Sequence, residues 1–312
     1  MRVLVTGAAG HVGSHVVDAL VGRGDEVLGI DNFATGRRIH VSDADGRYRF
    51  VEGTIADRDL VESLFGDFGP DAVVHTAASY KDPDDWVEDV RTNVHGMVNL
   101  VDSCRSAGTK RLVYFQTALI YGVKPLVNPV PLDHPRRVDN SSYAISKGAA
   151  EDYLSLSSLD HVTFRLANVI GPRNVSGPLP IFYQRLSNGQ RCFVTPARRD
   201  FVFVGDLVPA VLAAVDGTGS GAYHFSSGTD VPIETLYGTV ARGLGLDEVP
   251  EPDRRPLSDD DAPSILLDPS RTFQDFGEIE FTPIETTVAA AIKYYQQHGT
   301  LGEYTHLRLK KS

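Results

Sequence analysis

The chain has 312 residues, of which 42% are hydrophobic and 23% are charged, and its formal net charge at pH 7 is −11. This length favours two compact units rather than one. The negative charge, without a basic patch, argues against nucleic acid or an anionic membrane as a partner. No apolar run approaches the ~18 residues that a membrane-spanning helix needs.

The cysteine content and the first residues of the chain suggest in which cellular compartment the protein is found. The first expected strand begins at Arg2, which leaves no room for a signal peptide ahead of it, so we expect a cytoplasmic protein. The only cysteines are Cys104 and Cys192, which excludes a disulfide framework or a cysteine-rich zinc site. We expect two buried thiols and no metal, because the histidines also lack metal-ligand spacing.

Strands alternate with helices along the first half of the chain. Apolar runs predict six buried strands, at Val3–Val5, Val27–Ile30, Tyr48–Val51, Ala72–His75, Arg111–Phe115 and Val162–Leu166. Apolar residues at helical spacing predict helices at Val12–Val21, Val90–Cys104 and Tyr143–Leu156. This pattern is typical of a parallel sheet covered on both faces. We therefore predict an α/β fold, a Rossmann-type doubly wound parallel sheet with a smaller C-terminal substrate-binding lobe.

The pattern loosens after Asn168. Pro172, Gly177, Pro178 and Pro180 are expected to break the chain, and a second proline-rich, charged segment covers residues 248–269. We therefore place the sheet domain at 1–168 and the substrate-binding lobe mainly at 169–312, with part of 201–228 returning to the sheet domain.

A glycine-rich stretch, TGAAGHVGSH, lies between the first strand and the first helix. It places Gly7, Gly10 and Gly13 at three-residue spacing. Such a triplet alone can mark only a tight turn. Between a strand and a helix, its backbone N–H groups and the helix dipole can receive a pyrophosphate.

The end of the second strand indicates which dinucleotide is bound. Asp31 lies there, and a carboxylate at this place accepts hydrogen bonds from an adenosine ribose and repels a 2′-phosphate. Arg37 and Arg38 would suit NADP instead, but they lie beyond Asp31 and are expected to be solvated at the surface. The predicted cofactor is therefore NAD.

Several further segments carry a family resemblance. They are Val73–Ala78, the Asn93-Val-x-Gly motif, Thr117–Gly122, the Tyr143-x-x-x-Lys147 motif, Arg165–Arg173, and Arg199–Phe201 with Val204 and Asp206. With the glycine spacing, they resemble the extended short-chain dehydrogenase/reductase family. The resemblance covers nearly the whole chain and is nearest to the nucleotide-sugar epimerase/dehydratase branch, in particular the UDP-galactose 4-epimerases and the epimerases of O-antigen gene clusters.

Three residues form the predicted catalytic set. Tyr143 and Lys147 are four residues apart and so project from one helix face. A lysine ammonium and a nicotinamide cation near the phenol would lower the tyrosine pKa, which makes Tyr143 a candidate base for a substrate hydroxyl. Thr117, at the carboxyl end of the fifth strand, could hydrogen-bond the same oxygen. The alternatives are a solvated Tyr–Lys helix face and a threonine that caps a strand end.

The resemblance implies binding residues as well. The implied NAD site comprises Gly7, Gly10, His11, Val12, Gly13, Asp31, Asn32, Thr35, Gly36, Thr54, Ile55, Thr76, Ala77, Ala78, Asn93, Tyr143 and Lys147. The implied site for a nucleotide-diphosphate sugar comprises Thr117, Asn168, Arg199 and Arg255.

Two guanidinium groups can clamp a diphosphate through forked donors, which is the role implied for Arg199 and Arg255. The alternative for Arg254 and Arg255 is a surface loop balanced by residues 259–261. The resemblance further implies a homodimer, with helices at about 86–107 and 143–157 pairing across a twofold axis as a four-helix bundle.

Departures from the family pattern narrow the reaction. Dehydratases and decarboxylases of this branch carry acidic residues just after the catalytic Ser/Thr, where this chain has Ala118 and Leu119. Gln116 replaces the usual serine before Thr117 and is expected to reshape the sugar pocket. Thr54-Ile55 replaces a frequent acidic residue beside the adenine, which would weaken cofactor binding slightly.

These features favour an NAD-dependent nucleotide-sugar epimerase that acts at C4 through a transient 4-keto sugar. The alternatives are a nucleotide-sugar dehydrogenase or ketoreductase, a 4,6-dehydratase, and a non-catalytic NAD(P)-sensing protein. The complete set of Thr117, Tyr143 and Lys147 argues against the sensor. Retention of NAD by the purified protein would separate an epimerase from a dehydrogenase.

Overall fold

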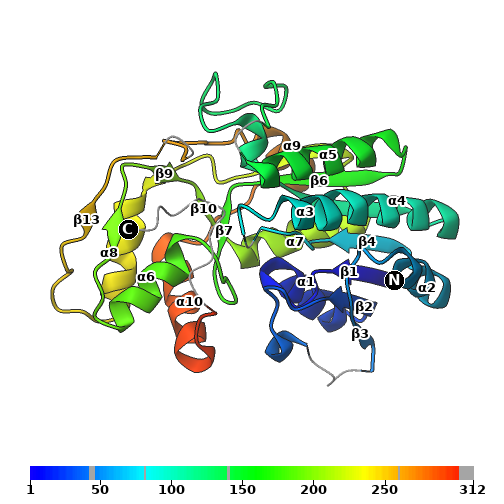
Figure 1. Ribbon diagram of the computed structural model, residues 1–312, viewed down its shortest axis with the longest axis horizontal. Helices are drawn as coiled ribbons and strands as arrows, with labels where there is room; N and C mark the ends of the chain where they lie inside the picture. Colours follow the sequence, from blue (N-terminus) through cyan, green and yellow to red (C-terminus); the bar gives the residue numbers. More distant parts are fainter. Residues whose placement is uncertain (42–45, 81, 139–140, 259–260, 302–312) are drawn as a thin grey trace.

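The computed structural model describes residues 1–41, 46–80, 82–138, 141–258 and 261–301. Its centre is a seven-stranded sheet in the order β11-β6-β5-β4-β1-β2-β3, with every neighbouring pair parallel (Figure 1). The strands are β1 (Arg2–Thr6), β2 (Glu26–Asp31), β3 (Tyr48–Glu52), β4 (Ala72–His75), β5 (Arg111–Thr117), β6 (His161–Leu166) and β11 (Gly221–Phe225). The six predicted strands and the Rossmann-type fold are confirmed, and β11 is an additional strand.

Helices cover both faces of this sheet. One face packs against α1 (His11–Gly22) and α7 (Val204–Val215), and the other against α2 (Arg58–Phe68), α4 (Gly96–Ala107) and α5 (Ser142–Leu156). The two-residue period of a strand explains the division, since Val3 and Val5 of β1 join the first core and Leu4 joins the second. The chain order reverses beside β1, and ligands of such sheets bind at the carboxyl ends of the strands there.

The helix predicted at 90–104 is divided in the structure. α3 (Trp86–Asp89) leads into a π-helical segment, η2 (Val90–His95), before α4 begins. π-Helical turns are rare and are frequent at functional sites. Here the segment carries Asn93, one of the predicted cofactor residues.

A separate core lies under the C-terminal lobe. It is built mainly from α6 (Pro178–Ser187), α8 (Ile233–Gly243) and α10 (Ile284–His298). Three short strand pairs complete this part: β7 (Asn168–Ile170) with β10 (Phe201–Phe203), β9 (Arg198–Arg199) with β12 (Val231–Pro232), and β8 (Phe193–Val194) with β13 (Asp253–Arg254). The sheet lies on one side of Figure 1 and this lobe on the other.

One segment differs from the expected pattern for an identifiable reason. Pro178 does not break the chain but occupies the first turn of α6, where a missing N–H costs nothing. After β10, the chain leaves the lobe through α7 and β11, and β11 pairs with β6; α9 (Ser270–Phe276) packs on β11. No helix in the described ranges is long and apolar enough to cross a membrane.

Candidate active site

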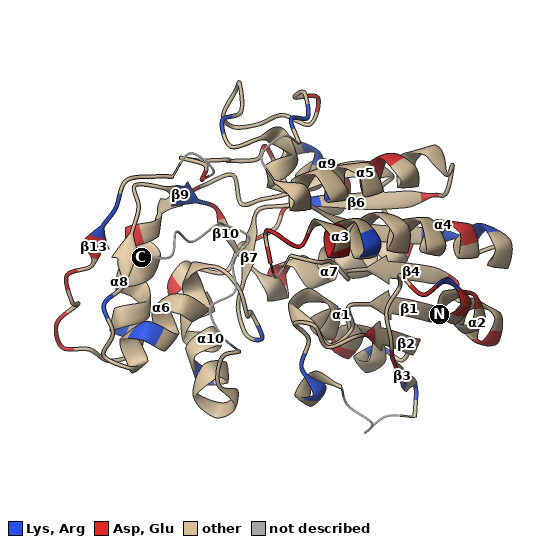
Figure 2. Cartoon of the chain, in the orientation of Figure 1, with Lys and Arg blue, Asp and Glu red and all other residues tan. Residues whose placement is uncertain are grey.

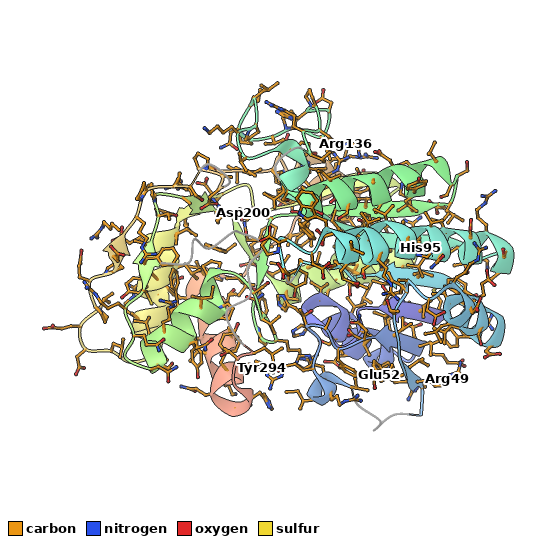
Figure 3. The ribbon with its side chains drawn as sticks, in the orientation of Figure 1. Arg49, Glu52, His95, Arg136, Asp200 and Tyr294 are labelled. Atoms are coloured by element: carbon orange, nitrogen blue, oxygen red, sulfur yellow. The ribbon has the colours of Figure 1, made fainter. Side chains whose placement is uncertain are left out.

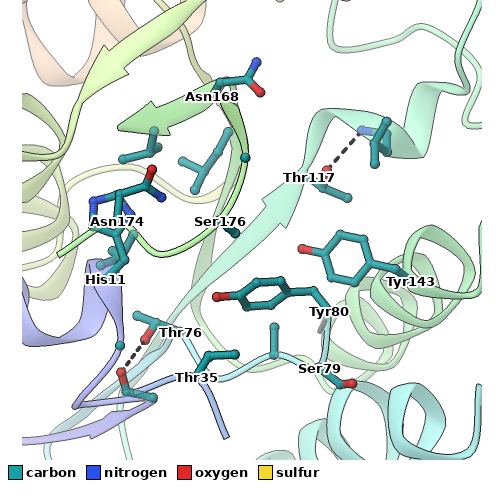
Figure 4. A pocket seen from close by; sticks show the side chains of 18 of the residues that line it. His11, Thr35, Thr76, Ser79, Tyr80, Thr117, Tyr143, Asn168, Asn174 and Ser176 are labelled. Carbon is teal, nitrogen blue, oxygen red and sulfur yellow. Dashed lines mark hydrogen bonds between the residues drawn. The ribbon is translucent and has the colours of Figure 1, made fainter. Parts of the chain in front are cut away.

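A cavity of about 610 Å³ lies between the carboxyl edge of the sheet and the C-terminal lobe. This volume is within the range of small-molecule and cofactor sites. Its wall includes these predicted residues: Gly7, Gly10, His11, Val12, Asp31, Asn32, Thr35, Thr54, Ile55, Thr76, Ala77, Ala78, Thr117, Tyr143, Asn168 and Arg199. The structure therefore brings most of the predicted cofactor, catalytic and substrate residues to one cavity (Figure 4).

The glycine-rich loop is closely packed against β4. Gly7 has a φ of +68°, which favours glycine, and a Cβ added there would lie 2.7 Å from the backbone nitrogen of Ala77. A Cβ on Gly13 would collide with the carbonyl oxygen of Gly7. The absence of side chains thus lets the start of α1 approach the sheet edge, where its N–H groups face the cavity.

Asp31 is held at the end of β2. Its carboxylate accepts hydrogen bonds from the N–H groups of Ala9 at 3.0 Å and Phe33 at 2.7 Å. Burial raises the pKa of Asp31, and the two hydrogen bonds oppose that effect. A carboxylate has lone pairs for further donors, so Asp31 can still accept from a ribose hydroxyl.

The two arginines beyond Asp31 are engaged elsewhere. Arg37 donates to the carbonyl oxygens of His298 and Gly299 after α10, and Arg38 pairs with Glu52 at 2.6 Å. Neither arginine lines the cavity.

These features fit NAD on three counts. The loop forms a cradle that side chains would fill, and an acidic residue lies at the ribose end of the cavity. His11 also has a buried ring nitrogen, Nε2, with no hydrogen-bond partner among the residues that the structure describes. A buried polar atom without a partner is costly, and a ligand with polar groups in this cavity would relieve that cost.

The catalytic hydroxyl groups converge from two elements. Thr117 ends β5, and its hydroxyl accepts a hydrogen bond from the N–H of Leu119 at 3.2 Å. Tyr143 lies in the first turn of α5, and both side chains face the cavity (Figure 4). The arrangement allows two hydroxyl groups to reach one substrate oxygen.

The protein alone does not produce the expected acidity of Tyr143. Burial raises its pKa, and Tyr80 and Asp89 act in the same direction. With NAD bound, the positive charge of the nicotinamide would act in the opposite direction and favour the phenolate. Lys147 is buried, and burial lowers its pKa to about 7 while Glu151 opposes this effect. The Lys147 ammonium lies 4.1 Å from the centre of the Tyr114 ring.

Five predicted residues do not line the cavity: Gly13, Gly36, Asn93, Lys147 and Arg255. Gly13 and Gly36 pack behind the cavity wall, Gly36 against the carboxylate of Asp31. Asn93 accepts from the N–H of Ser79 at 2.9 Å and donates to the hydroxyl of Ser146 at 2.9 Å. It thereby ties α5 to the segment that follows β4.

The substrate arginines occupy different surroundings. Arg199 lines the cavity and pairs with Asp261 at 2.5 Å. The neighbouring Asp200 is fully buried between the sheet and the lobe (Figure 3) and accepts hydrogen bonds from Ser226 and Ser227. These bonds fix the strand that carries Arg199.

Arg255 is exposed beside the cavity rather than within it. It pairs with Asp253 at 2.8 Å, and its guanidinium stacks 4.4 Å from the ring centre of Phe193, which does line the cavity. Residues 259 and 260, part of the predicted acidic balance for this loop, lie outside the described residues. The diphosphate role of Arg255 stays a prediction.

Several residues that line the cavity were not predicted from the sequence. Tyr80 lies two residues beyond the recognised strand motif, and its ring lies beside that of Tyr143 (Figure 4). Asn174 is buried with an unpartnered side-chain oxygen, and Arg185 is the second arginine of the wall. Proximity to a motif could have indicated Tyr80, whereas no periodic pattern marks the other two.

Carboxylates also reach the cavity. Asp82, Asp85 and Glu88 come from the acidic segment that leads into α3 (Figure 2). Within the described ranges, no group of three or more His, Cys, Asp or Glu side chains is arranged to hold a metal ion. Cys104 and Cys192 are buried and do not form a disulfide, as expected.

Comparisons with known proteins agree with this site. Residues 3–224 match the NAD dependent epimerase/dehydratase family. The UDP-glucose 4-epimerase of Mycolicibacterium smegmatis is 35% identical over 270 residues, which cover 80% of this chain and 85% of that protein. The crystal structure of the Bordetella bronchiseptica enzyme WbmH in complex with NAD+ is 64% identical, with a TM-score of 0.93, and the match covers 96% of this chain and 99% of that one.

A second enzyme of Bordetella bronchiseptica, WbmG, was crystallised with NAD and UDP. It is 39% identical, with a TM-score of 0.90, and the match covers 99% of each chain. The family match spans well over half of the sequence, and the match to the Mycolicibacterium enzyme passes 30% identity. The resemblance stated from the motifs is confirmed, and the chain belongs to the NAD dependent epimerase/dehydratase family.

Proposed function

We propose that this protein is an NAD-dependent epimerase that inverts C4 of a nucleotide-activated sugar. The observation that carries the proposal is one cavity with the glycine-rich loop at one end and the hydroxyl groups of Thr117 and Tyr143 beside it. The relatives support it, because the Mycolicibacterium enzyme is a UDP-glucose 4-epimerase and the WbmG crystal contains both NAD and UDP.

The chemistry divides between cofactor and protein. When bound, NAD+ supplies a site that accepts a hydride from the sugar and later returns it. Tyr143 takes the proton of the C4 hydroxyl, and Thr117 hydrogen-bonds the same oxygen as it becomes a carbonyl. Lys147 supplies a positive charge behind Tyr143. After the keto sugar turns over, Tyr143 returns the proton to the oxygen as the hydride returns to C4, so no net oxidation occurs.

An isomerisation is favoured over elimination by the segment after Thr117. Ala118 and Leu119 line the cavity at the positions where dehydratases of this branch carry acids. The carboxylates that do line the cavity, Asp82, Asp85 and Glu88, come from a different segment. A dehydratase is therefore the alternative to be excluded. The mass of the product does this, because a dehydratase removes one water and an epimerase does not.

We assign the nucleotide-diphosphate half of the substrate to the C-terminal side, at about residues 169–312. Arg199 lies in the cavity wall, and Arg255 lies next to it through Phe193. Asn168 lies in the same wall at the start of β7. In a chain of net charge −11, these groups supply the local positive and polar contacts that a diphosphate requires.

We also propose a homodimer. α3 and α5 pack together, and apolar side chains remain exposed along this face at Trp86, Val87, Val90, Ile145 and Leu156. An exposed apolar surface of this kind marks an interaction site, and twofold dimers are the commonest assembly. Light scattering at micromolar concentration should give the mass of two chains, and Val90→Asp should reduce it to one. A single-chain mass for the parent would contradict the dimer.

The two cysteines indicate in which cellular compartment the protein acts. Two buried cysteines that form no disulfide fit a reducing compartment, and we propose the cytoplasm. Fractionation of the source cells, with detection by antibody, tests this assignment.

The function is tested with a panel of UDP-, dTDP-, GDP- and ADP-sugars and no added NAD. We expect one or more of them to be converted to an isomer of unchanged mass, with bound NAD released only on denaturation. A product lighter by one water would identify a dehydratase instead. A stoichiometric rise of free NADH would identify a dehydrogenase.

A further inference from the structure

Gln116 is the residue before the catalytic threonine and forms part of the cavity wall, but its amide group is bound within the protein. Its side chain is 2% exposed and is turned toward α5. Its amide nitrogen donates to the carbonyl oxygen of Lys147 at 2.8 Å and to Oε2 of Glu151 at 3.0 Å. Its amide oxygen accepts from the N–H of Thr117 at 2.8 Å. One side chain therefore joins the backbone of the catalytic threonine to the catalytic helix.

Glu151 is a buried carboxylate whose oxygens are already bound. Arg165 of β6 donates to Oε1 through Nη2 at 2.7 Å and Nε at 3.2 Å. Gln116 donates to Oε2, and Arg136 lies 3.8 Å from that oxygen. Both Glu151 and Arg165 are less than 10% exposed, so these bonds, rather than water, satisfy the carboxylate.

Lys147 lies one helical turn from each of two groups that could attract its ammonium. Tyr143, Lys147 and Glu151 are spaced four residues apart on α5 and share one helix face. A lysine followed by a glutamate one turn later ordinarily forms an ion pair. Here the ammonium contacts the face of Tyr114 instead and forms no ion pair with Glu151.

We propose that Gln116 is a positioning residue, which saturates Glu151 together with Arg165 and so leaves Lys147 free to act on Tyr143. Without the Gln116 donor, Oε2 of Glu151 would lose its hydrogen bond and keep only the longer ion-pair contact with Arg136, at 3.8 Å. The Lys147 ammonium, one helical turn before Glu151 and already under its electrostatic influence, is a second cation able to replace the lost donor. Its charge would then move away from Tyr143.

This inference rests on the proposed epimerase function only for its kinetic consequence. The competition itself is a property of the folded chain with bound NAD. It can therefore be tested without knowing the sugar.

Other charged or titratable groups around Tyr143 and Lys147 must be the same in the parent and in the variants that are compared. They are Tyr80 after β4, Asp89 of α3, His75 of β4, Tyr114 of β5, Arg165 of β6 and Arg136 of the loop before α5. Burial holds the pKa of His75 well below its usual value, so its ring stays neutral at physiological pH. None of these groups is altered by a substitution at Gln116.

The first experiment titrates tyrosinate absorbance in the NAD-loaded protein. Subtracting the Tyr143→Phe variant isolates the step that belongs to Tyr143. Gln116→Met keeps the length of the side chain and removes all three hydrogen bonds, and it should move that step to higher pH by about one unit. Gln116→Ser serves as a second variant if the methionine is poorly accommodated. An unchanged titration in a folded variant would overturn the proposal.

A rescue experiment shows whether Gln116 acts by positioning Lys147 or only by packing. In Gln116→Met combined with Glu151→Met and Arg165→Met, no carboxylate competes for Lys147, and replacing a buried ion pair by apolar residues is often tolerated. We expect the titration of Tyr143 to return toward the parent value. A shift that persists in a folded triple variant would mean that Gln116 acts through packing, which would contradict the proposal.

The kinetic readout uses any sugar that the parent epimerises. Gln116→Met should lower kcat by roughly tenfold, a part of the ~10²-fold or more contributed by a positioned base, with little change in KM. The control is Thr109→Val, which removes another buried hydrogen bond, to the carbonyl oxygen of Pro70, far from the site. An inactive parent would refute the epimerase and leave the tyrosinate result valid, so the two failures are distinguishable.

Discussion

The two sides of the cavity are built in different ways. The cofactor side consists of strand ends and one tight loop, whose glycines leave the backbone open to the cavity. The substrate side consists of two- and three-residue strands and long connections, where side chains such as Arg199 are paired with carboxylates of the protein.

This difference has a consequence for ligand binding. The cofactor side is formed mainly by backbone rather than by long side chains, so we expect it to be organised before NAD binds. On the substrate side, Arg199 must exchange or share its contact with Asp261 when a diphosphate arrives. We expect tight retention of NAD and weaker, exchangeable binding of the sugar nucleotide.

The largest effect should come from filling the cofactor cradle. Gly13→Val places a branched side chain against the carbonyl oxygen of Gly7, and we expect no measurable NAD in the purified variant. Gly22→Ala, at the end of the same helix, has open space around its added Cβ and should retain NAD as the parent does. Cofactor content is measured after denaturation. Full retention by Gly13→Val would show that the loop is not the cofactor site.

The second-largest effect should separate catalysis from the binding of NAD and of UDP. Tyr143→Phe removes the phenol oxygen and keeps the ring, so turnover should fall by at least ~10²-fold while NAD and UDP remain bound. Calorimetry with UDP and cofactor content after denaturation report the two binding functions. Activity close to that of the parent would exclude Tyr143 as the base.

A third substitution acts on the substrate side alone. Arg199→Met should weaken UDP binding by roughly tenfold, as expected for loss of a charge-assisted contact, and should leave the NAD content unchanged. Arg198→Met is the matched control, because its neighbouring guanidinium pairs with Asp230 and does not line the cavity. Equal effects of the two variants would argue against a direct contact between Arg199 and the diphosphate.

The smallest effect concerns the choice between NAD and NADP. Asp31→Ala removes the carboxylate that would face a 2′-phosphate, so the preference for NAD should narrow by several-fold. Competition between the two dinucleotides for protein freed of cofactor measures it. Arg37 and Arg38 are held by α10 and Glu52, so we expect no reversal of the preference. A parent that purifies with NADP would contradict the assignment of Asp31.

The sequence was most informative where function depends on regular elements. The strands, the glycine spacing and the Tyr143/Lys147 pair are set by periodicity and short spacing, and the structure brings Tyr143 and Thr117 to one cavity. Asp31 could likewise be placed, because it ends a strand next to the one that precedes the loop.

The rest depends on contacts between distant segments. Arg255 has a suitable charge, but the pairing of β13 with β8 places it over Phe193 and outside the cavity wall. Gln116 was expected to reshape the sugar pocket, and only the packing of β5 against α5 shows that its amide is bound to the catalytic helix. No local pattern could have indicated either arrangement.

The most direct test of the central claim follows a label at C4 of the sugar. Substrate deuterated at C4 is incubated with the protein in ordinary water, without added NAD or a second substrate. The account predicts an isomer of unchanged mass that keeps the deuterium at C4, because the hydride returns to the carbon that it left. Loss of water from the product, washout of the deuterium or accumulation of free NADH would contradict a 4-epimerase.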